Sequence, residues 1–339
     1  DSSTYNEDGN GLPFFQGNAD FGEIYPAVRM WCSEPTKIAR EKDILISVRA
    51  PIGALNIANC ECCIGRGLAA LTVNEDICAQ EYLWHTLSGK VDELNSKGTG
   101  STFKAINKKT LSETEIPLPP IDEQRKIAAI LDKVSDLIAK RQQQLDKLDE
   151  MIKARFMEIF GDSETNTKNW RVLPMSKICS VGSSKRIYQS EQSSSGVPFW
   201  RISDLTSLIT TGTVTPELYI PEERYKELKT QGQVPAPGDI LITSRGTLGQ
   251  CYIVKVNDRF YFQDGMISWL SGYMDGVTPL YISYLFTMPG FRKQIDSMQA
   301  GSTVAYLSIT MIKKLKVMLP DIESQQQFAS FVSKTEKTK

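Results

Sequence analysis

"DILISVRAPIG" (residues 43–53) and "DILITSRGTLG" (residues 239–249) decide the fold, because one chain contains nearly the same stretch twice. Six of the eleven positions are identical, and three others exchange Ser for Thr, Ala for Gly and Ile for Leu. Each stretch holds a short apolar run and a Gly-containing turn, and "GALNIA" or "GQCYIV" follows. This pattern predicts a strand, a turn and a second strand in both places.

Three further pairs of segments follow the same order along the chain. "GLPFFQGNAD" (11–20) parallels "GVPFWRISD" (196–204), and Gly67 parallels Gly265. "GSTFKAINKKTLSETEIPLPPIDEQ" (100–124) parallels "GSTVAYLSITMIKKLKVMLPDIESQ" (301–325). The repeated unit is a whole domain, so a short-period solenoid is excluded. A helix is also expected in each copy, over residues 76–94 and 278–295, with Thr278 as its N-cap in the second copy.

A long helix is predicted between the two copies. Residues 122–160 contain neither Gly nor Pro, and Gly161 is a natural stop. Apolar side chains recur with heptad spacing, which is typical of a helix that packs on a partner helix. These partner-helix seam residues are Ile127, Leu131, Val134, Ile138, Leu145, Leu148 and Ile152.

The predicted fold class is α+β, with two duplicated mixed α/β domains joined by one long coiled-coil-type helix. The first domain covers residues 1–120, and the helix covers 121–161. The second domain covers 162–320, and the start of an equivalent helix covers 321–339. From the comparison of the copies we expect an incomplete N-terminus and a truncated second helix.

The composition excludes several classes of protein. The chain has 339 residues, is 41% hydrophobic and has a net charge of −1. It has no apolar run long enough for a membrane span and no signal-peptide pattern. Seven cysteines with irregular spacing favour reduced thiols and a cytoplasmic location. The cluster "CECC" (60–63) lacks a second ligand pair, so no metal is predicted, and strand packing is preferred over a metal site.

Together these residues resemble the specificity subunit of Type I restriction–modification systems, over essentially the whole chain. "PLPPIDEQRKIAAILDKVSDLI" (117–138), which leads into the long helix and "KARFMEIFGD" (153–162), looks like the central conserved region of that family. "NWRVLPMSKIC" (169–179) looks like the opening of a target-recognition domain. "PGDILITSRGTLG" (237–249) and "AGSTVAYLS" (300–308) look like features within one.

The resemblance implies two target-recognition domains that each read one half of a split double-stranded DNA sequence. It also implies that the two long helices form an antiparallel bundle, which sets the spacing of the halves and docks two methyltransferase subunits beside restriction subunits. S-adenosylmethionine, ATP and Mg are then expected only on those partners, and this chain has no cofactor of its own. No membrane contact is implied, and the location is the bacterial or archaeal cytoplasm.

Catalytic motifs of partner enzymes do not occur in the sequence. The single Pro-Pro pair lies in "PLPPID" and lacks the neighbours of an amino-methyltransferase motif. No G-x-x-x-x-G-K-[S/T] loop occurs, and one histidine leaves little for triad chemistry. We therefore expect a non-catalytic protein. A coiled-coil interaction protein that tethers two ligand-binding domains, without DNA specificity, is the alternative.

Candidate DNA-contact residues come from four features of the two copies. The Ser-rich loop "SSKRIYQS" (183–190) is basic, although it could simply be a solvated loop. Arg49 and Arg245 share one repeat position, so they either contact phosphates or cap the turn. Residues just after the shared "PF" differ between the copies and could discriminate sequence. The Gly-Ser-Thr loops could bind phosphates or serve as ordinary caps. The candidates are Lys185, Arg186, Tyr188, Gln189, Arg201, Ser203, Arg245, Thr303, Tyr306, Gln16, Asn18, Arg49, Thr102 and Lys104.

Overall fold

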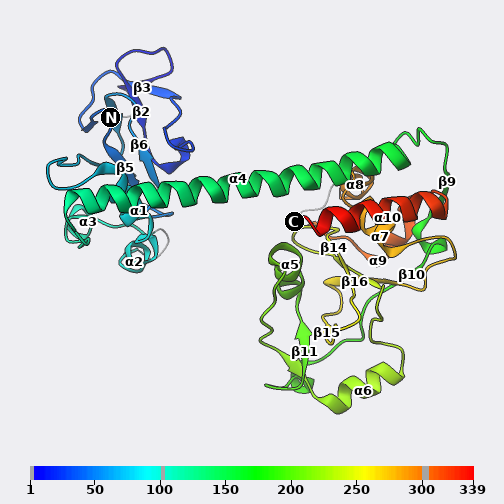
Figure 1. The fold of residues 1–339 in the computed structure, drawn as a ribbon. Coiled ribbons are helices and arrows are strands. Elements are labelled where there is room, and N and C mark those ends of the chain that lie inside the picture. Colours follow the sequence, from blue (N-terminus) through cyan, green and yellow to red (C-terminus); the bar gives the residue numbers. More distant parts are fainter. Residues whose placement is uncertain (1–3, 101–103, 300–304) are drawn as a thin grey trace. The chain divides into compact units, whose positions relative to one another are not determined.

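The computed structural model describes residues 4–100, 104–299 and 305–339. The chain forms two compact units, Asp1–Gln142 (unit 1) and Gln143–Lys339 (unit 2). The predicted long helix is confirmed as α4 (Ile121–Phe160), which runs from one unit into the other (Figure 1). The four domain ranges stay predictions, because the units divide inside this helix.

In its described part, unit 1 contains two sheets and three short helices. The larger sheet has the order β1-β3-β2-β7-β4, with the bounds Tyr5–Asn6 (β1), Leu12–Phe15 (β2), Met30–Cys32 (β3), Ile38–Ala39 (β4) and Cys62–Ile64 (β7). The smaller sheet has the order β6-β5-β8, with the bounds Ile44–Ser47 (β5), Leu55–Ile57 (β6) and Leu68–Leu71 (β8). The helices are α1 (Gln80–Ser88), α2 (Val91–Ser96) and α3 (Lys108–Ser112).

Unit 2 contains three sheets in its described part. They have the orders β10-β16-β13-β14, β12-β11-β15 and β17-β9. The strands are Arg171–Pro174 (β9), Ser180–Gly182 (β10), Val197–Trp200 (β11), Tyr219–Ile220 (β12), Ile240–Thr243 (β13), Cys251–Ile253 (β14), Tyr261–Phe262 (β15), Ile267–Ser271 (β16) and Lys316–Leu319 (β17). The helices are Ile202–Thr211 (α5), Glu222–Thr230 (α6), Pro279–Leu285 (α7), Pro289–Ser297 (α8), Ile309–Lys314 (α9) and Ile322–Glu336 (α10).

The two units repeat the same strand topology. In unit 1, β2 pairs antiparallel with β3 and parallel with β7, and β5 lies between β6 and β8. In unit 2, β11 pairs antiparallel with β12 and parallel with β15, and β13 lies between β14 and β16. The predicted duplication and mixed α/β class are therefore confirmed in three dimensions.

The repeated "DILI" stretch forms an inner strand in both units, β5 between β6 and β8 and β13 between β14 and β16. Its isoleucines and leucine in β5 and β13 are completely buried, which explains why the run is apolar without alternation. The aspartate before each strand closes a turn: Asp43 Oδ2 accepts from Arg40 N and Asp239 Oδ2 accepts from Ala236 N, both at 2.8 Å. Burial raises the pKa of Asp239, although hydrogen bonds from Ala236 and Trp269 lower it. Its contribution to stability therefore falls as the pH rises through that pKa.

A buried glutamine ties the start of α4 to the rest of unit 1. Gln124 Nε2 donates to Ile77 O (2.9 Å) and Pro119 O (2.7 Å), while its Oε1 accepts from Ala79 N (2.9 Å). The amide therefore satisfies backbone groups just ahead of α1 and just ahead of α4 at the same time.

Gln325 makes the same three bonds at the start of α10 in unit 2. Its Nε2 donates to Gly276 O (2.8 Å) and Pro320 O (3.0 Å), and its Oε1 accepts from Thr278 N (2.9 Å). The "DEQ" and "ESQ" ends of the repeat thus encode one device, a glutamine clamp between a loop and the helix that follows the domain.

The last turns of α4 are part of the core of unit 2. Ile152, Phe156 and Phe160 are buried, and both phenylalanines pack edge-on against Phe328 of α10. Figure 1 shows α10 alongside this segment. The helix ends where expected, because Gly161 adopts a left-handed φ of +78° that suits glycine.

The predicted seam residues differ in burial along α4. Ile152 is buried, whereas Ile127, Leu145 and Leu148 are half-buried. Leu131, Val134 and Ile138 are exposed, at 38%, 45% and 66%. Whether a partner helix covers them stays a prediction.

The single helix expected in each copy was wrong. Residues 76–94 form α1 and α2, which are separated at Gly89, and residues 278–295 form α7 and α8, with Pro289 at the first position of α8. Proline lacks the N–H that a continuous helix needs, and glycine favours a helix end. The N-cap at Thr278 is confirmed, since its side chain accepts from Tyr281 N. Over the described residues, no helix is long and apolar enough to span a bilayer.

Candidate nucleic-acid interface

Unit 1 contains a pocket of about 650 Å³ at the ends of β2, β5 and β7. Three of the predicted DNA-contact residues line it, namely Gln16, Asn18 and Arg49. Lys37 and Arg66, which the sequence analysis did not single out, line it as well. The structure therefore brings together residues from four separate stretches of chain.

The pocket is positively charged. Lys37, Arg49 and Arg66 are exposed, and no carboxylate is among the lining residues. Within the described residues, none of the three forms an ion pair; Lys37 Nζ donates only to Leu68 O, at 3.2 Å. Since the chain as a whole has a net charge of −1, this pocket is a local concentration of positive charge.

Close backbone packing shapes the pocket. Asp20 Oδ2 accepts from Gln16 N at 2.8 Å and holds the loop that follows β2. A Cβ on Gly67 would lie 2.6 Å from Gln16 O, and one on Gly65 would lie 2.9 Å from Gln16 Cα. Only glycine lets the turn after β7 approach this loop without a clash, which explains the two glycines of the "IGRG" sequence.

The end of β5 places two predicted residues next to each other. Ser47 Oγ donates to Arg49 O at 2.8 Å, and Ala50 N donates to Lys104 O at 3.0 Å. Arg49 and Lys104 are both exposed, so the backbone brings two cationic residues from distant parts of the sequence close together at the end of β5. Thr102 lies outside the described residues.

In unit 2 the equivalent arginine is supported by an aromatic ring. Arg245 follows β13 and is exposed, with its guanidinium carbon 5.1 Å from the centre of the Tyr306 ring. Leu307 N donates to Ser244 O at 3.0 Å and draws the two segments together. The sequence predicted both side chains independently, and the structure makes them one cation–π pair. Thr303 lies outside the described residues.

The loop 183–190 presents the other predicted residues of unit 2. Lys185, Arg186, Tyr188 and Gln189 are all exposed. Tyr188 is 63% exposed, which is unusual for a tyrosine ring and suits stacking or hydrogen bonding to a ligand.

Arg201 and Ser203 lie at the start of α5, Arg201 as its N-cap and Ser203 in its first turn. Arg201 precedes α5 and pairs through Nη2 with Glu217 (2.8 Å) and through Nε with Asp204 (3.6 Å). The Arg201–Glu217 hydrogen bond raises the pKa of Arg201. Ser203 is exposed in the first turn of α5. Arg201 is thus less available to a ligand than the sequence suggested.

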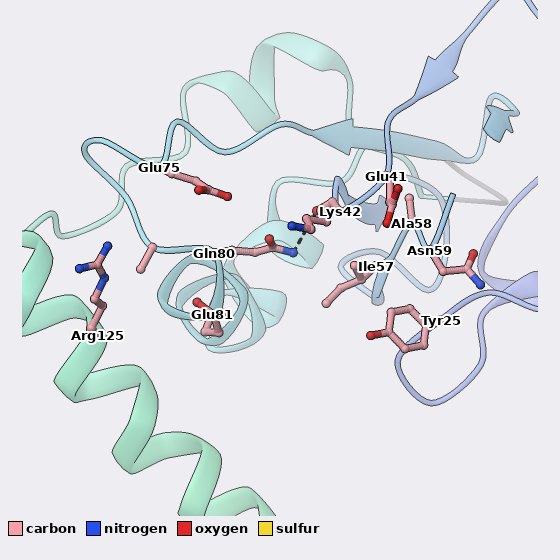
Figure 2. Close-up of a pocket in the computed structure, with 11 residues that line it drawn as sticks. Tyr25, Glu41, Lys42, Ile57, Ala58, Asn59, Glu75, Gln80, Glu81 and Arg125 are labelled. Atoms are coloured by element: carbon pink, nitrogen blue, oxygen red, sulfur yellow. Dashed lines mark hydrogen bonds between the residues drawn. The ribbon is translucent and has the colours of Figure 1, made fainter. Parts of the chain in front are cut away.

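Figure 2 shows a second pocket of unit 1, of about 520 Å³. Gln80 closes one side by donating to Lys42 O at 2.9 Å. Three glutamates line this pocket against only Lys42 and Arg125. Its excess of negative charge disfavours phosphate groups, so it is not the preferred nucleic-acid site.

Sequence reasoning missed Lys37, Arg66 and Asp264, which lie in or near these sites. A signal was present for Arg66, because it stands between two glycines in a turn of the repeat. Lys37 carries no such signal, since only the fold brings it to the pocket.

The chain was compared with known proteins. A model described as "Type I restriction modification DNA specificity domain" matches residues 33–150 and 167–339. The putative type I restriction enzyme MjaX specificity subunit of Methanocaldococcus jannaschii is 42% identical over 167 residues, which are 49% of this chain and 39% of that protein. The MjaIX specificity subunit of the same organism is 25% identical over 311 residues, 85% of this chain and 69% of that protein.

The fold is also similar to solved structures. The S subunit of a type I restriction–modification system from M. genitalium has a TM-score of 0.55 and 14% identity, over 100% of this chain and 85% of that chain. A further chain, from a study of complex assembly and conformational transition of the type I system, has a TM-score of 0.55 and 16% identity, over 98% and 84%. The chain spans 39% of the MjaX protein and 60% of a putative specificity subunit of Haemophilus influenzae.

Proposed function

This chain belongs to the type I restriction modification DNA specificity family, and from this premise we propose that it selects the DNA sequence on which partner enzymes act. Each unit reads one half of a split target in double-stranded DNA. The chain itself supplies no catalysis. Its relatives are named specificity subunits, which supports this division of labour.

One observation carries the proposal: the pocket of unit 1 combines three cations with two side-chain amides. Lys37, Arg49 and Arg66 suit phosphates or guanine, while Gln16 and Asn18 suit the edge of adenine. A small-molecule site would need a more apolar lining and fewer exposed charges. Extended contact with a polyanion accounts for this chemistry best.

The partners are proposed from the family and from α4. We expect methyltransferase subunits, two in the full assembly, together with restriction subunits. These partners would carry S-adenosylmethionine, ATP and Mg. The exposed Leu131, Val134 and Ile138 would be covered by a helix in that assembly. The assembly would operate in the cytoplasm. The alternative, a tethering protein without DNA specificity, is not favoured by the family match.

The test is to co-express the chain with a methyltransferase subunit of a type I system and to map methylated bases across the host genome. The expected result is one motif with two short defined halves around a fixed spacer. The methyltransferase alone is the control and should leave no such motif. A continuous motif, or no methylation in the presence of a stable complex, would contradict the proposal.

A further inference from the structure

Two equivalent turns of the units carry opposite charges. In unit 1 the turn 65–67 joins β7 to β8, and its second residue is Arg66. In unit 2 the turn 263–266 joins β15 to β16, and its second residue is Asp264. Each turn leads from the strand that pairs in parallel with β2 or β11 into the strand that pairs antiparallel with β5 or β13, so the two turns occupy the same place in the fold.

A backbone bond confirms that the turns are equivalent. Gly65 N donates to Phe15 O at 2.8 Å, and Gln263 N donates to Trp200 O at 2.9 Å. In each case the first residue of the turn bonds to the last residue of the strand that the turn lies against.

Asp264 brings a guanidinium to the turn of unit 2. Its Oδ2 accepts from Nε of Arg186 at 2.9 Å. The Arg186 side chain is 64% exposed and that of Asp264 is 22% exposed. A guanidinium therefore stands at this turn in both units: Arg66 extends from the turn itself, and Arg186 comes from a neighbouring loop and is held by the turn.

The loop that carries Arg186 is anchored on β15, the strand that leads into this turn. Ser184 Oγ donates to Phe262 O at 2.7 Å. Lys185 N donates to the hydroxyl of Tyr261 at 2.9 Å, and that hydroxyl donates to Lys185 O at 3.1 Å. Arg186 is thus oriented by its own ion pair and by the two residues before it.

We propose that Arg66 in unit 1 and Arg186 in unit 2 each read a guanine of the target, and that Asp264 is the positioning residue for Arg186. This inference rests on the proposed function and assigns base-reading residues to it. Arginine can donate two parallel hydrogen bonds to O6 and N7 of guanine in the major groove. A mobile arginine would contact phosphates as readily as bases, so orientation decides the role.

The geometry of Arg186 suits this role. Asp264 engages only Nε, and among the described residues neither Nη group of Arg186 has a partner. The two Nη groups stay available to donate. Arg201 differs, because its Nη2 is engaged by Glu217. An exposed ion pair adds little to stability, so orientation is the effect that the Arg186–Asp264 pair supplies.

The experiment selects bound duplexes from a randomised library with the purified full chain and with its variants. The variants are Arg66→Ala, Arg186→Ala, Arg186→Lys, Asp264→Asn and Asp264→Glu. Arg259→Ala is the matched control, because Arg259 is also an exposed arginine of unit 2 that pairs with a carboxylate, Glu222. Thermal melting of each variant checks that it folds.

With the wild type and the control, we expect a split motif with a guanine in each half. Arg186→Ala and Asp264→Asn should lose about 10- to 100-fold of the preference for guanine at one position of one half, with the other positions unchanged. Arg186→Lys should keep overall affinity but lose the preference, and Asp264→Glu should restore part of it. Arg66→Ala should relax one position of the other half.

Two results would overturn the inference, and they differ from failure of the proposed function. An unchanged motif with Arg186→Ala or Arg66→Ala removes that arginine from base reading. A uniform loss at all positions in a folded Asp264→Asn variant removes the positioning role. If the wild type itself selects no split motif, the proposed function fails.

Discussion

At the scale of single residues, the two copies share a glutamine that holds the backbone and differ in charge at one equivalent turn. Gln124 and Gln325 make the same three bonds in the two units. By contrast, Arg66 and Asp264 have opposite charges at equivalent turns. Under the proposed function this difference is expected, because each copy would keep its fold while it reads a different half of the target.

Replacing Gln325 by Leu should destabilise unit 2 by about 1–3 kcal/mol, because Thr278 N and two carbonyls, of which Pro320 O is buried, would lose their partner. Urea unfolding followed by tryptophan fluorescence measures the effect. Gln326→Leu is the matched control: its side chain is exposed on the same helix and should change stability by less than about 0.5 kcal/mol. Equal effects of the two substitutions would show that the clamp does not stabilise the unit.

At this scale, sequence reasoning could single out a residue where the repeat itself marked its position. Arg49 and Arg245 were singled out from their shared position, and both are exposed after the inner strand, while their contact with DNA stays a prediction. Lys37 could not be found, because it becomes part of a pocket only through the pairing of β4 with β7. The ion pair of Arg201 with Glu217 was missed for the same reason, since α5 was not expected.

At the scale of elements, α4 is the feature that the sequence predicted best. Its length without Gly or Pro and its heptad spacing are strong local signals. The breaks between α1 and α2 and between α7 and α8 were harder to predict. Apolar side chains continue across these breaks. Tertiary packing therefore determines whether each segment forms one kinked helix or two separate short helices.

Two isoleucines of α4 should respond differently to truncation. Ile152→Ala should cost about 2–5 kcal/mol of stability, because Ile152 is buried in the core of unit 2. Ile138→Ala should cost less than about 0.5 kcal/mol in the isolated chain, since Ile138 is 66% exposed, yet it should weaken assembly with a methyltransferase subunit. Denaturant unfolding and co-purification measure the two effects. If a double variant with Ile138→Ala and Leu131→Ala still assembled normally, the prediction that a partner helix packs on these residues would be wrong.

At the scale of the whole molecule, the two units should contribute independently to DNA binding. Arg49→Ala and Arg245→Ala remove one cation each from different compact units. Each should lower the slope of log affinity against log salt by about 1, and the double variant by about 2. The coupling free energy between them should be below about 0.5 kcal/mol.

A salt series of fluorescence-anisotropy titrations on one specific duplex measures these slopes. Lys97→Ala is the control, because the Lys97 ammonium already pairs with Glu93 at 2.6 Å. Strong coupling, or a slope that Arg49→Ala leaves unchanged, would speak against separate phosphate contacts by the two units.

The matched registers of β5 and β13 also bear on how such a protein can change over generations. Ile44 pairs with Ile57 and Leu71, and Ile240 pairs with Ile253 and Leu270. A genetic crossover within the codons for "DILI" would therefore join the first part of one copy to the last part of the other. The strand-pairing register around the joined strand would stay the same. The offspring chain would inherit an intact scaffold with a new combination of loops. Novel specificity could then arise by shuffling, without any new fold having to evolve.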